Sequence, residues 1–236
     1  MKRFSPLPIL SLGLFCLVGH VSAETVTFQD NFDCKPGEAG TPLDLRNIGT
    51  SQTAWEATAN IVVAEGNGLN VTDQNPFIGR VTLPGELKEV AVEADINPVA
   101  PASQTESPAT WLSVGIGNGP LINPSFGGLF LLVRPGGAYS LMFNPESDDT
   151  RSSRAVALKN GRIQSWNPDG MNHVKIVYDK AADSVSAFAN GDETLVDGVV
   201  LKDKNLALDA AFAGFSGIWQ SPETRGVGKF SATITK

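Results

Sequence analysis

The sequence predicts an all-β fold, a two-sheet antiparallel sandwich, on three observations. Turn signals such as Asn-Gly and Asp-Gly recur at short intervals, and they supply the positive φ angles that tight hairpin turns require. The apolar runs between them alternate with a period of two, as half-buried strands do. No long segment has the helical period. The turn signals stand at 67–68, 118–119, 135–137, 160–161, 190–191 and 197–198.

The strands follow from these runs. Residues 90–96 and 173–178 alternate apolar and polar side chains, which predicts strands with one buried face. Residues 129–133 and 139–143 are apolar at nearly every position, which is typical of strands that cross the middle of a sheet. Because these two runs flank the Pro-Gly-Gly turn at 135–137, they are predicted to form one hairpin.

Three segments fall outside this pattern. Residues 205–213 come nearest to a helix, and we expect at most a single turn there, leading into a strand at 212–215. Residues 98–108 and 145–154 predict long surface loops. Loops of this length in a compact domain often carry function, although disordered surface loops have the same composition.

The N-terminus has the layout of a secretory signal peptide. Two basic residues open it, residues 9–18 form a short apolar stretch, and residues 21–23 offer the small side chains of a cleavage site. The apolar stretch is shorter than the ~18 residues of a membrane-spanning helix, which argues against an anchor. We therefore expect a signal peptide at 1–23, a single β-sandwich domain at 24–236, and a secreted or periplasmic protein.

Charge and cysteine content exclude several classes of function. The net charge is −7, with 42% hydrophobic and 18% charged residues, so the chain can fill a core but lacks the basic clusters that nucleic acid or an anionic membrane would need. Beyond the predicted signal peptide only Cys34 remains, which rules out an internal disulfide. His173 alone cannot make a zinc site. We expect no cofactor, no nucleic-acid partner and no membrane insertion after signal cleavage; the sequence indicates no oligomeric state.

Two segments carry a family resemblance. The first combines Trp166, a His-Val-x-Ile-x-Tyr-Asp run at 173–179 and Asn-Gly at 190–191; the second is Gly-Phe-Ser-Gly at 214–217. The first is similar to a hairpin of laminin G-like domains and the second resembles a late strand of legume-type lectins, both of the concanavalin A-like superfamily. The resemblance implies a two-sheet jelly roll that displays sugar or protein ligands on a concave face or at loop tips. The superfamily also contains glycoside hydrolases and lyases.

The same resemblance implies that the first and last strands pair. Residues 28–33 open the predicted domain and residues 228–234 close it, and both fit edge-to-edge neighbours in such a sandwich. This pairing would place the two ends of the domain side by side.

Glu93 and Asp95 are the candidate acidic residues. On their predicted strand they project from one face, about 6.6 Å apart, where two carboxylates could divide acid and base roles or hold a cation. The segment resembles the metal-ligand strand of legume lectins and the start of the E-x-D-x-x-E signature of laminarinase-type hydrolases. However, Pro98 stands where the hydrolases have Glu, and Ala94 and Ile96 depart from the lectin pattern. Solvated outer-face carboxylates are the competing interpretation, and we expect no metal site and little stabilisation by added Ca²⁺.

Trp111 and Ser113 are predicted to face away from the core, because Leu112, Val114 and Ile116 occupy the alternate positions. An outward Trp beside polar side chains suits a sugar, whose C–H faces stack on aromatic rings. We expect this face to be the one that carries the two carboxylates. The competing interpretation is a Trp at a strand end, covered by the preceding loop.

Arg134 ends an apolar strand, where it could contact a ligand carboxylate; an ion pair with Glu93 or Asp95 is the preferred interpretation. The candidate carbohydrate-binding residues are thus Glu93, Asp95, Trp111, Ser113 and Arg134. They favour an exported, noncatalytic carbohydrate-binding domain that recognises poly- or oligosaccharide on one sheet face. The alternatives are a glycan-cleaving enzyme that uses Glu93 and Asp95, and a structural or protein-interaction module of the cell envelope.

Overall fold

The computed structural model describes most of the chain beyond its first 22 residues. The described ranges are 23–101, 110–118, 127–145, 155–191, 193–218, 220–222 and 225–236. The predicted signal peptide, most of the two predicted loops at 98–108 and 145–154, and Gly119 of one predicted turn lie outside these ranges.

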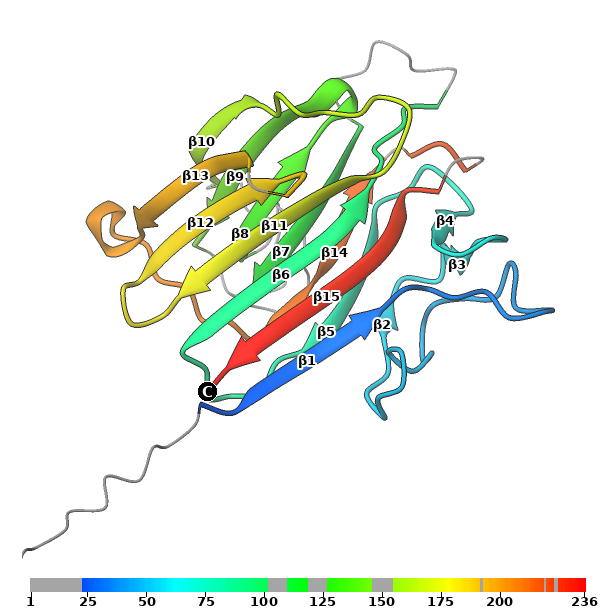
Figure 1. Ribbon diagram of the computed structural model, residues 1–236, viewed down its shortest axis with the longest axis horizontal. Coiled ribbons are helices and arrows are strands. Elements are labelled where there is room, and N and C mark those ends of the chain that lie inside the picture. The colour runs from blue at the N-terminus through cyan, green and yellow to red at the C-terminus, as the bar shows by residue number, and fades with distance from the viewer. Residues whose placement is uncertain are drawn as a thin grey trace, which may run out of the picture.

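The described chain forms two antiparallel β-sheets that face each other (Figure 1). The strands of the larger sheet are β1 (Thr25–Asp30), β3 (Ile61–Val63), β4 (Leu69–Val71), β6 (Glu89–Ile96), β11 (Asn172–Asp179), β12 (Ser184–Ala189), β13 (Glu193–Val200) and β15 (Val227–Thr235). They run in the order β13-β12-β11-β6-β15-β4-β3, and β1 also pairs with β15. The predicted all-β, two-sheet antiparallel sandwich is therefore confirmed.

The smaller sheet packs behind the larger one in Figure 1. Its strands are β2 (Glu56–Ala57), β5 (Phe77–Thr82), β7 (Trp111–Gly117), β8 (Gly128–Val133), β9 (Ala138–Asn144), β10 (Val156–Arg162) and β14 (Phe212–Ile218). They run in the order β10-β9-β8-β7-β14-β5-β2. The outer face of each sheet is the side turned away from the other sheet.

The core fills the space between the two sheets. Alternate residues of β6 and β11, such as Val92 and Ile176, have no exposed surface and point inward. An aromatic cluster of four fully buried rings lies among them, and the nearest ring centroids are 5.0 Å apart. The four rings belong to Phe32, Trp55, Phe215 and Phe230. Trp55 donates from Nε1 to the buried carboxylate of Asp30, 2.9 Å away, so the one polar atom of this indole is satisfied.

Several predicted elements are confirmed. β8 and β9 form the hairpin around the Pro-Gly-Gly turn, now seen as the 3₁₀ turn η2 (Pro135–Gly137). β1 pairs with β15 from Thr25–Thr235 to Asp30–Phe230, which brings the first and last strands side by side. Cys34 is a free, partly buried residue packed against the core.

Two predicted turns are wrong. Asn160-Gly161 lies inside β10, because Gly161 packs against the ring of Tyr139, where a Cβ would come within 2.7 Å of ring atoms. Asp197-Gly198 lies inside β13, where Gly198 has a φ of 57° and the register with β12 shifts. Each glycine thus serves close packing or a bulge rather than a chain reversal.

The segment at 205–213 forms no helix. A 3₁₀ turn, η3 (Lys202–Lys204), precedes it, and β14 begins at Phe212 as the sequence predicts. In the part of the chain that the structure describes, no helix has the length and hydropathy needed to cross a membrane.

Candidate functional site

The candidate residues lie on opposite sides of the sandwich. Glu93 and Asp95 stand on β6, on the outer face of the larger sheet. Trp111 and Ser113 stand on β7, on the outer face of the smaller sheet. The prediction that all four share one face is wrong. Alternation along each strand gave the right orientation relative to the core, but it carries no information on which sheet a strand joins.

On the larger sheet, His173 lies between the two carboxylates. Its Nδ1 is 2.9 Å from Oδ1 of Asp95, and its Nε2 is 3.5 Å from Oε2 of Glu93. The register causes this contact, because Asp95 pairs with His173 and Glu93 pairs with Lys175 across β6 and β11. Lys175 Nζ lies 3.9 Å from the same Glu93 oxygen. The two carboxylates therefore neutralise cationic groups of the neighbouring strand.

This environment raises the pKa of His173 above its ordinary value. The hydrogen bond to Asp95 is the largest cause, and the negative charges of Glu93 and Asp95 act in the same direction. Partial burial and the positive charge of Lys229, on β15, oppose the rise. At neutral pH the imidazole consequently holds a larger protonated fraction than a free histidine would.

Arg134 does not pair with Glu93 or Asp95, contrary to the preferred interpretation. It lies at the end of β8 in the smaller sheet and donates from Nη1 to the hydroxyl of Ser140, 3.2 Å away. Ser140 belongs to β9 and points to the outer face, since its neighbours Tyr139 and Leu141 belong to the core. Arg134 therefore shares the outer face of the smaller sheet with Trp111.

The register of the smaller sheet sets Trp111 between two strands. Trp111 pairs with Ile218 of β14 on one side. On the other side Leu112 pairs with Val133, so the next facing positions are Trp111 and Arg134. Trp111 is partly buried and does not pack against the hydrophobic core. Trp111 and Arg134 thus occupy facing positions at one end of this face.

Ser113 lies next along the same face but is fully buried. Its hydroxyl lies 2.8 Å from that of Ser216 on β14, which is also fully buried. Ser113 faces away from the core as predicted, but it offers no exposed surface to a ligand. The two hydroxyls satisfy each other's hydrogen bonding inside the sheet, next to Trp111.

Gln220 holds the backbone around Trp111 and was missed by sequence reasoning. Its side-chain amide donates to the carbonyls of Trp111, at 3.0 Å, and Ile218, at 3.1 Å. Its Oε1 accepts from the Val99 amide at 3.1 Å. A buried glutamine beyond a strand end has no sequence signature, because the partners on Trp111 and Val99 come from distant parts of the chain.

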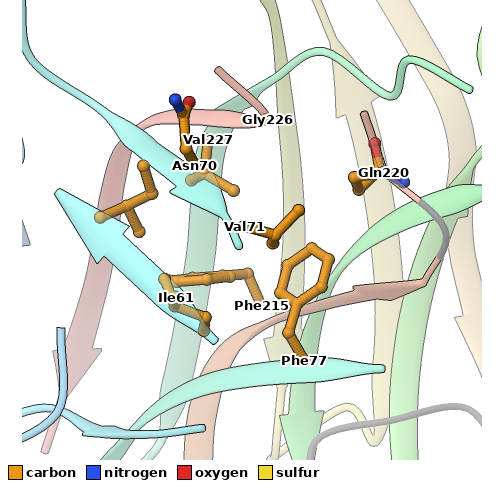
Figure 2. A pocket seen from close by; sticks show the side chains of 9 residues that line it. Ile61, Asn70, Val71, Phe77, Phe215, Gln220, Gly226 and Val227 are labelled. Carbon is orange, nitrogen blue, oxygen red and sulfur yellow. The ribbon is translucent and has the colours of Figure 1, made fainter. Parts of the chain in front are cut away.

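A small cavity lies inside the sandwich beside Phe215 and Phe77 (Figure 2). Figure 2 shows aliphatic and aromatic side chains around it, with the amides of Asn70 and Gln220 at its margin. The centre of a water-sized sphere can occupy only about 10 Å³ of it. This space holds one water at most and cannot take a sugar.

No protein-family model and no curated protein sequence matches the chain. Among solved structures, Ulex europaeus lectin I in complex with the methyl glycoside of α-L-fucose is similar with a TM-score of 0.53 and 11% identity, over 89% of this chain and 97% of that one. The exoplasmic/lumenal domain of VIP36 with calcium and mannose gives 0.52 and 12%, over 82% and 87%. The metal-free carbohydrate recognition domain of Emp46p gives 0.50 and 12%, over 77% and 87%. The chain therefore has the concanavalin A-like jelly-roll fold that the sequence resemblance implied.

The VIP36 complex contains calcium, so the donor groups of this chain bear on whether it could bind the same ion. Calcium takes six to eight oxygen ligands, several of them carboxylates. Within the described ranges, no three Asp, Glu, His or Cys side chains group as a metal site would require. Glu93 and Asp95 instead share their charge with His173 and Lys175. The described residues do not fit a calcium site.

Proposed function

We propose that this protein is a noncatalytic carbohydrate-binding domain that takes a poly- or oligosaccharide at the end of the outer face of its smaller sheet, where Trp111 and Arg134 stand. The observation that carries the proposal is the position of Trp111 opposite Arg134 at the end of β7 and β8. An indole ring offers a flat apolar surface to the C–H face of a sugar ring. A guanidinium beside it donates several hydrogen bonds in a fixed plane to hydroxyl or carboxylate oxygens.

Rigid support around this pair favours binding. Gln220 ties the Trp111 carbonyl to the segment after β14, and Ser140 accepts a hydrogen bond from Arg134. A site whose side chains are held before the ligand arrives loses less entropy on binding. The three similar lectin structures support the proposal through their shared fold, on which carbohydrate recognition is already built.

A fluorescence titration tests the proposal. Purified protein is titrated with soluble glucans, galactans and uronic-acid polymers, and tryptophan emission is followed. We expect a saturable change with at least one polymer, and loss of binding in Trp111→Ala. The matched control is Trp166→Phe, because Trp166 packs against the core instead. Equal binding by Trp111→Ala and the parent protein would contradict the assignment of this face.

The alternatives predict different results. A glycan-cleaving enzyme would release reducing sugar from one of these polymers, and the release would disappear in both Glu93→Gln and Asp95→Asn. A structural or protein-interaction module of the cell envelope would bind none of the polymers. We expect binding without release, since Glu93 and Asp95 are both engaged with His173 on the face opposite Trp111.

We also propose that the domain acts outside the cytoplasm, released by signal cleavage after Ala23. The support is the basic start, the short apolar stretch and the small residues at 21–23. N-terminal sequencing of exported material should begin near Glu24. An intact Met1 on exported protein would contradict this proposal.

A further inference from the structure

A second, polar pocket opens at the end of the larger sheet. It lies where β6 leaves the sheet, β15 enters it, and the turn between β3 and β4 approaches both, a region seen at the right of Figure 1. Its free volume is about 320 Å³, which lies within the range of small-molecule sites. Among the described residues, its lining consists of Asn67, Asn97, Asp169, Gly170, Met171, Arg225 and Gly228.

Arg225 is fixed at one wall of this pocket. Its Nη1 donates to the carbonyls of Gly66, at 2.6 Å, and Asn67, at 3.0 Å. The turn that presents these carbonyls needs Gly68, whose φ is 94° and where a Cβ would lie 2.9 Å from the Val227 carbonyl. The Asn-Gly signal at 67–68 therefore shapes the pocket as well as the hairpin.

Asp169, which also lines the pocket, stands in a loop that the buried side chain of Asn172 holds together. Asn172 has no exposed surface, and its side chain bonds the Asn167 amide and the carbonyls of Asn167 and Gly170, at 2.8 to 3.1 Å. Asn167 Oδ1 in turn accepts from the Asp169 amide at 3.1 Å. The loop before β11 is thus ordered by internal hydrogen bonds, and Asp169 stands on a defined turn.

The polar side chains of this pocket retain unused hydrogen-bonding capacity. Within the described residues, the Asp169 carboxylate, the Asn97 amide, and Nε and Nη2 of Arg225 have no protein partner. Asp169 and Arg225 line one pocket yet form no ion pair. Met171 lies beside Gly228, where a Cβ would come within 3.4 Å of its methyl carbon, and adds an apolar surface.

We propose that this pocket binds a single neutral sugar residue, as a second site on the sheet opposite Trp111. A sugar hydroxyl both donates and accepts, so one ring with neighbouring hydroxyls can satisfy a carboxylate, an amide and a guanidinium together. Met171 then covers an apolar patch of the ring. The ligand class rests on the function proposed above, whereas the location is independent of it. Two sites on opposite faces would let one domain bridge two glycan chains.

The test uses free monosaccharides, which are too short to need an extended face. Methyl glycosides of glucose, galactose, mannose, fucose and N-acetylglucosamine are titrated into ¹⁵N-labelled protein, and amide shifts are followed. Gly170 and Gly228 report on the pocket. Asp169→Asn removes the carboxylate that accepts from the sugar, and Arg225→Gln removes the guanidinium that donates to it. We expect each variant to weaken binding about tenfold or more. Asp203→Asn, on the exposed η3 turn, is the matched control.

The outcomes separate this inference from the proposed function. Saturable shifts at Gly170 and Gly228 that are lost in the two pocket variants support the second site. Absence of shifts there with every monosaccharide, or unchanged binding in both pocket variants, overturns it. Polymer binding that depends on Trp111 would survive either result. If polymers also fail to bind, the proposed function fails on its own test.

Discussion

The hydroxyl oxygens of Ser113 and Ser216 lie 2.8 Å apart across β7 and β14, and neither residue has exposed surface. They occupy the outer face of the smaller sheet, at the next outward position along β7 from the pair of Trp111 and Ile218. A buried hydroxyl without a partner costs more than a neutral hydrogen bond contributes, so each serine depends on the other.

Removing one member of this pair should therefore leave the other hydroxyl buried without a partner. We expect Ser113→Ala and Ser216→Ala each to lower the free energy of unfolding by about 1–3 kcal/mol, since each leaves one buried hydroxyl unpaired. The double variant should lose less than the sum of the two. Urea unfolding of all four proteins gives this double-mutant cycle. Additive losses would show that the two hydroxyls do not depend on each other.

Trp111 and Leu112 should differ in their effect on stability. Leu112 has no exposed surface and belongs to the core, so Leu112→Ala should cost about 2–5 kcal/mol. Trp111 is partly buried outside the core, and Trp111→Ala should cost less than Leu112→Ala. Denaturant unfolding of both variants checks this. An equal or larger loss for Trp111→Ala would assign the indole to packing and remove the main residue of the proposed sugar face.

Added calcium should stabilise the protein little. A tight site that binds only the folded state would add about 2.7 kcal/mol at a hundredfold excess over its dissociation constant. Glu93 and Asp95, the acidic pair that resembles a lectin metal strand, are both in contact with His173 instead. Thermal unfolding with calcium and then with EDTA measures the effect. A midpoint that rises by several degrees and falls back with EDTA contradicts this prediction.

Alternation along the chain was enough to predict which side of β6 and β7 packs into the core. The core positions, such as Val92 and Val114, are the ones that the period-two pattern selects. Alternation did not predict that the outer face of β7 is buried as well, as it is at Ser113. Alternation could not predict sheet membership. β6 and β7 follow each other in sequence, yet they pair with β15 and β14 in different sheets, through contacts between distant parts of the chain. This long-range pairing separates Glu93 from Trp111.

The polar contacts of the site were equally out of reach. The pairing of Asp95 with His173 depends on the register between β6 and β11, and the chain between these two strands runs through the other sheet. Asn172 and Gln220 satisfy backbone groups that become buried only when the sandwich closes. Local turn chemistry was a partial guide: it located the turns at 67–68 and 190–191, where both residues have positive φ, but it misplaced the glycines that pack inside β10 and β13.

His173 should make stability depend on pH. Its pKa is raised in the folded protein, first by Asp95, so folding favours the protonated imidazole. This stabilisation is present in full at pH values below the unfolded pKa of about 6.5. It is lost as the pH rises through the higher pKa of His173 in the folded protein. The groups facing the ring are Glu93 and Asp95 from β6, Lys175 on β11 and Lys229 on β15.

The comparison of the parent protein with His173→Gln isolates this contribution. Because the side chains of His173 and Asp95 are each 35% exposed, solvent screens the interaction, and we expect less than about 1 kcal/mol. Urea unfolding is measured for both proteins from a pH below the unfolded pKa of the imidazole to a pH well above its folded pKa. Over this range the unfolding free energy of the parent should fall by more than that of His173→Gln. By NMR titration, the pKa of the His173 imidazole should be higher in the parent than in Asp95→Asn. This variant weakens the hydrogen bond that raises the imidazole pKa most. If both proteins show the same pH dependence of stability, or if Asp95→Asn leaves the imidazole pKa unchanged, the contact between Asp95 and His173 does not couple protonation to folding.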